Sequence, residues 1–152
     1  MAADSPVVRE IFIDASPEEV FPYLTISARY SLWMGIAAEL DPRPGGVYRV
    51  DANGRNVILG KYVEVSPPRR VVFTWGFADP ESPVPAGSTT VEIDLIPQGR
   101  GTLLRLVHRG SPPERRGRHE QGWSHYLARL QIAAAGADPG RDPFADPSAG
   151  HD

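Results

Sequence analysis

The chain has 152 residues, 41% of them hydrophobic, which is enough for one folded domain with a sizeable apolar core. Its formal net charge of −3 argues against a nucleic-acid partner, because binding to phosphates normally requires a basic surface. The sequence contains no cysteine, which excludes disulfides, a thiol nucleophile and cysteine-based zinc or iron–sulfur sites. We find neither a secretion signal nor a window apolar enough to span a membrane, so we expect a cytoplasmic protein with no membrane partner.

The first half of the chain predicts one strand, two short helices and then further strands. Residues 7–14 are rich in β-branched side chains, which is typical of a strand. Ser16 followed by Pro17 indicates a helix start, with the serine as N-cap, and Pro22 should end or kink that helix early. A second short helix is expected over residues 27–33. Three strands separated by the turn sequences PRPGG and DANG are expected at 37–41, 47–50 and 56–65.

The second half predicts three more strands, one long helix and a disordered tail. The long helix should run from about Pro113 to Ala135. Residues 137–152 are rich in Pro, Gly, Ala and Asp, and Phe144 is their one large apolar residue, so we expect this tail to be disordered and dispensable. The folded domain is then expected to cover residues 5–136. The three strands are expected at 71–77, 88–96 and 101–109.

These last strands alternate between an apolar and a polar face. Glu92 and Asp94 on the polar face are expected to pair with Arg105 or Arg109 of the neighbouring strand. An antiparallel sheet with one wet face needs a cover over the other, and the long helix is the only predicted element large enough. The apolar face carries Val71, Phe73, Trp75, Phe77, Val91, Ile93, Leu95, Leu104, Leu106 and His108.

The long helix has an apolar face that suits this role. Gly122 interrupts the helix at a cost of about 1 kcal/mol relative to alanine, so we expect a strand to pass close to the backbone there. The residues predicted to face the sheet are His119, Trp123, Tyr126, Leu127, Leu130, Ala133 and Ala134.

The segment HEQGWSHYLARL of this helix excludes two kinds of site. His119 and His125 are six residues apart, which separates them by about 120 degrees around a helix, so they do not bind one metal ion as two histidines four residues apart would. GWSHY begins like a nucleophile elbow, but Tyr126 stands where the second glycine is required. We therefore expect no metal site and no serine nucleophile.

Several short motifs in a fixed order carry a resemblance to a known family. They are Trp33, DPRPGG before Tyr48, GKYVEV at 60–65, PPRR at 67–70, FTW at 73–75, TLLRLVH at 102–108 and GWSHYLARL at 122–130. Over residues 5–135 or so the chain resembles the START-like (SRPBCC) superfamily, and within it the branch of homologues of the activator of heat-shock protein 90 ATPase. The resemblance implies an α+β helix-grip (START/Bet v-like) fold. In that fold a curved antiparallel sheet of about six or seven strands wraps around a long C-terminal helix, and two short helices follow the first strand.

The resemblance also implies a cavity between the sheet and the long helix that holds a small apolar ligand. We expect a ligand-binding protein rather than an enzyme, with no cofactor and no catalytic residue, as a monomer or homodimer. With such a cavity, Leu106→Phe should be tolerated and should weaken ligand uptake. The residues expected to line the cavity are Trp33, Met34, Tyr48, Phe73, Trp75, Phe77, Leu104, Leu106, His108, His119, Trp123, Tyr126, Leu127 and Leu130.

Two alternative functions stay open. His108 and His119 can meet inside the cavity and act as acid and base, as in an enzyme of the polyketide cyclase or hydrolase kind. The simpler interpretation, which we favour, is that each is a hydrogen-bonded or partly exposed histidine near the end of its element. The other alternative is an interaction module that grips a chaperone.

Overall fold

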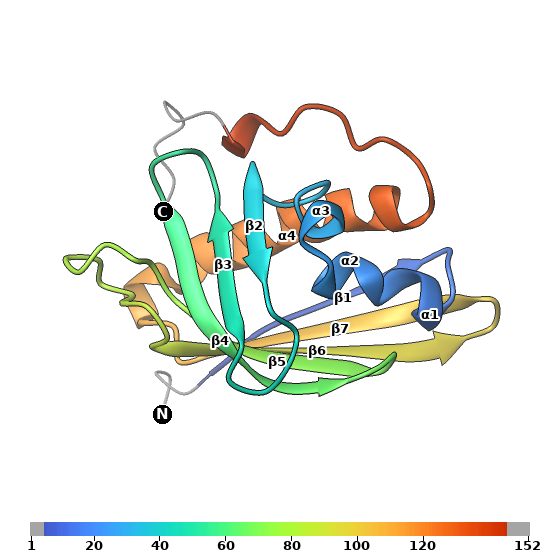
Figure 1. Cartoon of the computed structure of the whole chain (residues 1–152), viewed down its shortest axis with the longest axis horizontal. Coiled ribbons are helices and arrows are strands. Elements are labelled where there is room, and N and C mark those ends of the chain that lie inside the picture. The colour runs from blue at the N-terminus through green and yellow to red at the C-terminus, as the bar shows by residue number, and fades with distance from the viewer. Residues whose placement is uncertain (1–4, 146–152) are drawn as a thin grey trace.

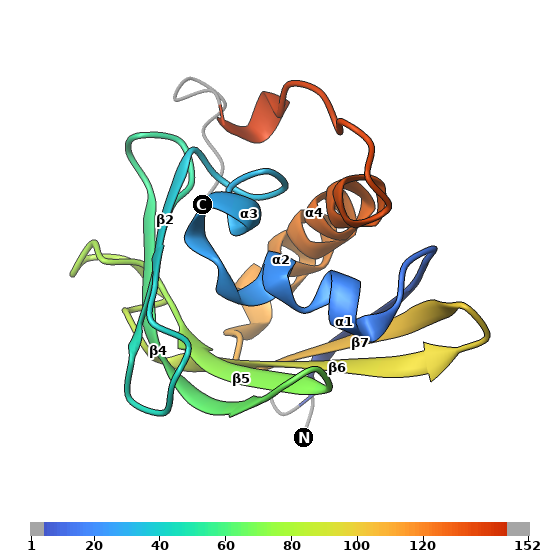
Figure 2. The same cartoon turned by 45° about the vertical axis from the view of Figure 1, so that its right-hand side comes forward.

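The computed structural model describes residues 5–145, which form one strongly curved antiparallel sheet with the helices on its concave side (Figure 1; Figure 2). The sheet has seven strands in the order β1-β7-β6-β5-β4-β3-β2, so each strand from β2 to β7 lies beside its neighbour in sequence and β1 closes against β7. This arrangement confirms the predicted α+β helix-grip fold. The strands are β1 (Val7–Ile13), β2 (Ala37–Leu40), β3 (Val47–Asp51), β4 (Val57–Ser66), β5 (Arg70–Trp75), β6 (Thr89–Gln98) and β7 (Gly101–Arg109).

The first helix begins where the sequence predicts. Ser16 caps the first helix: its hydroxyl accepts from the backbone N–H of Glu19, and the Glu19 carboxylate accepts from the backbone N–H of Ser16. Pro22 ends that helix early, as expected, and starts the next one. No helix within residues 5–145 is long and apolar enough to cross a lipid bilayer. The helices are α1 (Pro17–Val20), α2 (Pro22–Thr25), α3 (Ser27–Tyr30), η2 (Pro113–Arg115), α4 (Arg116–Ala134) and η3 (Pro143–Ala145).

The strand register places one row of buried side chains across the concave face. His108 of β7 lies opposite Val7 of β1 and Val91 of β6. Val91 in turn lies opposite Phe73 of β5, and Phe73 lies opposite Tyr62 of β4. None of the five side chains is more than 1% exposed, so the alternation in the sequence identifies the inner face correctly.

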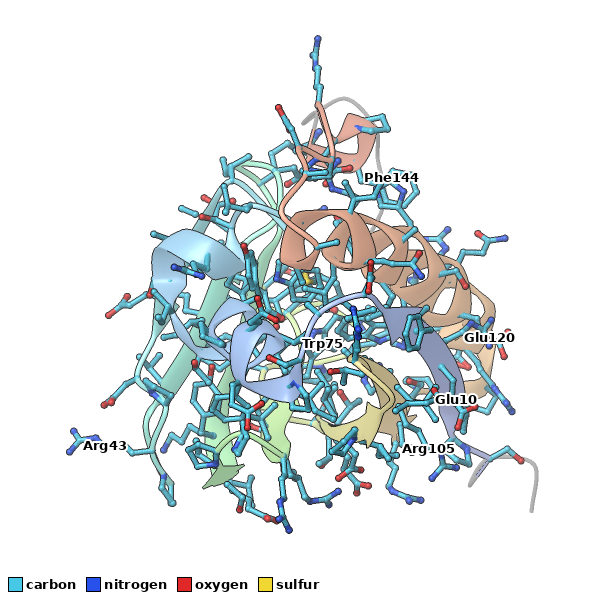
Figure 3. All side chains as sticks on the ribbon, turned by 90° about the vertical axis from the view of Figure 1, so that its right-hand side faces the viewer. Glu10, Arg43, Trp75, Arg105, Glu120 and Phe144 are labelled. Carbon is cyan, nitrogen blue, oxygen red and sulfur yellow. The ribbon has the colours of Figure 1, made fainter. Side chains whose placement is uncertain are left out.

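Ion pairs hold the outer face, with partners that differ in part from the prediction. Arg109 pairs with Glu92 as expected, at 3.0 Å. Asp94 instead accepts two hydrogen bonds from Arg70 of β5, at 2.8 and 2.9 Å. Arg105 pairs across the other edge of β7 with Glu10 of β1, and both lie at the surface in Figure 3. Asp94 lies directly opposite both arginines, and Arg70 is the one it binds.

Helix α4 lies across the concave face, and its buried residues are the seven that the sequence predicts. It is not the only cover, contrary to the prediction, because α1, α2 and α3 lie beside it in the same concavity (Figure 2). Val20, Leu24 and Tyr30 of these short helices are fully or almost fully buried in the core. Together α1, α2, α3 and α4 cover the concave face of the sheet.

The prediction of a close strand at Gly122 is wrong. A Cβ atom built on Gly122 would have no heavy atom within 4 Å outside its immediate neighbours and the adjoining helix backbone. The glycine borders a cavity instead. The low helix propensity of glycine at this turn is therefore associated with open space beside the helix and not with a neighbouring strand.

Residues 137–145 differ from the predicted disorder, because they turn back and lie along α4 (Figure 1). The buried carboxylate of Asp142 lies 2.7 Å from Nε2 of His125, and the Phe144 ring stacks on the same histidine at 4.0 Å between centroids. A few polar and aromatic contacts thus position a segment with little apolar surface. Residues 146–152, which complete the predicted tail, lie outside the described residues.

Candidate ligand-binding site

A small cavity of about 70 Å³ lies between the sheet and the N-terminal half of α4. Trp75, at the end of β5, forms part of its wall and lies in the interior of the molecule below α4 in Figure 3. The wall is almost entirely apolar and aromatic. It is formed by Met34, Ala52, Asn56, Ile58, Trp75, Phe77, Arg118, His119, Gly122, Trp123 and Tyr126.

The fourteen residues expected at a ligand site separate into two groups. Six of them line the cavity: Met34, Trp75, Phe77, His119, Trp123 and Tyr126. The other eight lie outside its lining and fill the interior around it: Trp33, Tyr48, Phe73, Leu104, Leu106, His108, Leu127 and Leu130.

The side chains of the second group pack against, or hydrogen-bond to, other residues of the protein. Tyr48 stacks on Phe73 with 4.0 Å between ring centroids, and its hydroxyl bonds to that of Tyr30. The indole N–H of Trp33 donates to the backbone carbonyl of Tyr23 at 2.9 Å. These rings share the face of the cavity residues, but neighbouring side chains cover them completely, so the alternation alone does not separate the two groups.

Five lining residues were missed by the sequence reasoning. Ala52, Asn56 and Ile58 come from β4 and the turn that joins it to β3, and Arg118 and Gly122 come from α4. Gly122 carried a signal, since a glycine inside a helix needs a reason, but the reason is space and not close approach. The other four residues carried no such signal in the sequence. Ala52, Asn56 and Ile58 reach the cavity because the curvature of the sheet brings the turn between β3 and β4 over α4.

His108 is a hydrogen-bonded core residue with both ring nitrogens engaged. The indole N–H of Trp123 donates to its Nδ1 at 3.0 Å, because an indole nitrogen only donates. Neutral His108 therefore carries its proton on Nε2 and donates it to the Thr89 hydroxyl at 2.8 Å, which donates to the Trp75 carbonyl at 2.7 Å. Burial, together with the neighbouring His119, lowers the pKa of His108 to about 3. The chain of bonds ties α4 to three strands.

His119 stacks on His108 with 4.9 Å between ring centroids, so the two histidines do meet, but only His119 lines the cavity. Its Nδ1 lies 2.7 Å from the Ser111 hydroxyl. Its Nε2, by contrast, has no hydrogen-bond partner among residues 5–145, although the side chain is only 6% exposed. Burial lowers the pKa of His119 to about 4, with a smaller contribution from Arg115, so the ring is uncharged at neutral pH.

Two further polar atoms on the cavity wall are buried without a partner in the described part of the chain. They are the indole Nε1 of Trp75 and the hydroxyl of Tyr126. Burial is the main cause that raises the pKa of Tyr126, so this hydroxyl keeps its proton. Three side chains that line the apolar cavity therefore each carry a buried, uncharged polar atom without a partner in the described part of the chain. Residues 5–145 contain no group of three acidic or histidine side chains that could hold a metal ion.

The family model described as "Activator of Hsp90 ATPase homolog 1-like protein" matches residues 14–135. No match was found among the curated proteins. An AHSA1-like protein from Rhizobium etli shares 46% sequence identity, covers 93% of this chain and 88% of its own, and superposes with a TM-score of 0.73.

Two more distant structures widen the comparison. An HSP90 activator from Plasmodium falciparum is 25% identical over 84% of this chain and 95% of its own, with a TM-score of 0.65. An Aha1 from Colwellia psychrerythraea, solved as a dimer, is 20% identical over 86% of this chain and 96% of its own, with a TM-score of 0.73. At that identity the second structure is informative about the fold alone.

Proposed function

Because the chain belongs to the family of activator of Hsp90 ATPase homolog 1-like proteins, we propose that it binds a small, largely apolar molecule between its sheet and α4. The observation that carries the proposal is the cavity, whose wall is built mainly from aromatic and aliphatic side chains, three of which carry an unpartnered polar atom. Ligand sites have this character, because burial of apolar surface supplies affinity and a few polar atoms supply orientation.

The size of the cavity limits the ligand. At about 70 Å³ it is well below the roughly 300–1,000 Å³ of pockets for drug-sized molecules. A ligand is therefore small, or side chains move to admit it. Met34 is the wall residue best suited to move, because its unbranched thioether has three rotatable bonds. Its sulfur accepts a hydrogen bond from the Tyr30 hydroxyl at 3.6 Å.

The test is a titration with a small aromatic probe, followed by tryptophan fluorescence, since Trp75 and Trp123 both line the cavity. Gly122→Leu would place a side chain in the cavity and should abolish the fluorescence change. Gly117→Leu is the matched control, because Gly117 is an exposed glycine of the same helix and a Cβ atom there would also meet no heavy atom within 4 Å. Equal probe binding by wild type and Gly122→Leu, or no binding by wild type, would refute the proposal.

The bonding of His108 weighs against the alternative of an enzyme that uses two histidines. Both of its ring nitrogens are occupied, and its low pKa disfavours proton uptake at neutral pH. Of the two histidines, only His119 has a ring nitrogen without a partner among residues 5–145, so a paired acid and base lacks one member.

A chaperone-interacting module is the second candidate, favoured by the likeness to the Plasmodium falciparum activator. It predicts that the purified protein binds a purified Hsp90 and stimulates its ATPase. Gly122→Leu should retain this effect, because the substitution fills the cavity and leaves the other faces of the protein unchanged. The protein's own assembly, as a monomer or homodimer, is measured by light scattering in the same preparation.

A further inference from the structure

Three buried polar atoms on one wall show what kind of ligand the cavity suits. Trp75, His119 and Tyr126 are each at most 6% exposed, and each has a polar atom without a partner among residues 5–145. They account for three of the six such atoms in the described chain, and all three side chains line the same cavity. Buried polar groups are normally hydrogen-bonded, because an unpaired one is costly. Unpartnered polar atoms in side chains that line an apolar cavity are suited to a polar group of a ligand.

The chemistry of the three atoms defines what they accept. The Trp75 indole N–H only donates, so its partner must be a hydrogen-bond acceptor. The hydroxyl of Ser111 can donate to His119 Nδ1, which leaves a proton on Nε2 as a second donor toward the cavity. The Tyr126 hydroxyl can donate or accept. An oxygen atom with two lone pairs matches this set.

The charge state of the wall favours an uncharged oxygen. Burial keeps His119 unprotonated and Tyr126 protonated at neutral pH, so neither side chain carries a charge there. Arg118 is the one charged side chain of the lining, and it lies at the exposed rim. Transfer of a carboxylate from water to this site is costly, because the three buried polar atoms of the lining are neutral and do not compensate its charge.

The shape of the wall favours a flat ring. Trp75 meets Phe77 edge to face, with 5.1 Å between centroids at 70°, and it lies 6.5 Å from the Trp123 ring at 47°. Tilted rings of this kind present both faces and edges to an aromatic guest. A cavity of about 150 Å³ admits benzene, so one of about 70 Å³ must roughly double in volume, through movement of a residue such as Met34, to admit a single ring.

We infer that the ligand is a neutral single-ring aromatic molecule with a carbonyl or phenolic oxygen that accepts hydrogen bonds from Trp75 Nε1 and His119 Nε2. This inference rests on the proposed function, since it presupposes that the cavity binds a ligand. It adds the polar group of the ligand and the two donors that bind it, at the end of β5 and near the start of α4.

Three probes of similar size test the inference: acetophenone, ethylbenzene and benzoate. Acetophenone should bind about fivefold or more tightly than ethylbenzene, the ratio expected from about one net hydrogen bond. It should also bind more tightly than benzoate. In a ¹⁵N–¹H spectrum of the three tryptophans, the indole N–H signal of Trp75 should lie further downfield with acetophenone than with ethylbenzene, because both rings shift it and only acetophenone adds a hydrogen bond. The signal of Trp33 serves as an internal control, because this indole lies outside the cavity lining and already donates within the protein.

Trp75→Phe keeps a ring and removes the donor. It should abolish most of the preference for acetophenone over ethylbenzene while ethylbenzene still binds, which also shows that the variant is folded. Equal affinity of the wild type for the two probes, or a preference for benzoate, would overturn the inference and leave the apolar pocket standing. If no probe binds the wild type, water alone satisfies the three polar atoms, and the proposed function falls together with the inference.

Discussion

At the scale of single residues, burial determines the charge state of the two stacked histidines. His108 and His119 lie face to face, and a proton on either ring would repel a proton on the other. His108 would also lose the hydrogen bond from Trp123, because protonated Nδ1 no longer accepts. The folded protein therefore requires both rings to be neutral.

This requirement predicts a loss of stability in mild acid. The pKa values of His108 and His119, about 3 and about 4, lie below the ordinary value of 6.5, so the unfolded chain takes up these protons first. The contribution is fully present above about pH 6.5 and is lost as the pH falls toward the folded pKa values. Between about pH 6.5 and 5, above most carboxylate titration, the free energy of unfolding should fall by up to about 1.4 kcal/mol per pH unit for each histidine.

Urea unfolding across this pH range measures the slope. His119→Asn should reduce it by about half, since one of the two histidines no longer titrates. A wild-type slope near zero, or an unchanged slope in the variant, would show that the histidines accept protons in the folded state.

At the scale of elements, side chains of α4 hold the C-terminal segment, residues 137–145, which has few large apolar side chains of its own. Arg129 of α4 donates from Nη1 to the carbonyl of Gly140 at 3.1 Å and from Nε to the carbonyl of Trp33 at 3.1 Å. The same guanidinium thus binds the C-terminal segment and the end of the α3 region. Asp142 bonds to His125 one turn earlier on the helix.

Removal of residues 138–152 should therefore destabilise the protein by about 2–4 kcal/mol, through loss of the buried Asp142 contact and the Phe144 ring. The melting temperature should fall by about 2–4 °C for each kcal/mol. The control is a shorter truncation that removes residues 146–152 alone, so that the difference between the two proteins isolates the described segment. Identical melting of both would mean that the segment is dispensable, as its composition predicts.

At the scale of the whole molecule, the sheet wraps the helices so closely that little of the interior is left unfilled. The inner rows of the sheet meet α4 and the short helices, and the cavity occupies only one end of this interface. Leu106, opposite Ile93 on the neighbouring strand, is fully buried outside the cavity lining. Its surroundings are those of a packed core and not of a ligand pocket.

Leu106→Phe is accordingly expected to cost about 1–3 kcal/mol by overpacking, in contrast to the tolerance expected from the sequence. Gly122→Ala provides the comparison, because its added methyl group enters open space and helix propensity favours it by up to about 1 kcal/mol. Urea unfolding of the two variants should move in opposite directions. A neutral Leu106→Phe would mean that the unfilled space extends along the sheet beyond the present wall.

The sequence by itself determined the elements and their faces. Ser16 and Pro17 start α1 because their capping chemistry acts over three residues, and the buried face of α4 follows from its helical period. Such features depend on the backbone within a few residues, so they can be predicted locally.

Only the tertiary structure decided which buried residues border a cavity. Trp75 and Phe73 share one strand face, yet Trp75 lines the cavity while Phe73 is covered by Tyr48. The cavity is the small volume left between large side chains from distant segments, so it depends on sheet curvature and on how those side chains pack together. The same holds for the tail, where Asp142 and His125 are seventeen residues apart, and for His108, whose bonding partners lie on other elements. These contacts join residues distant in the chain, and local sequence patterns carry no information about their distances.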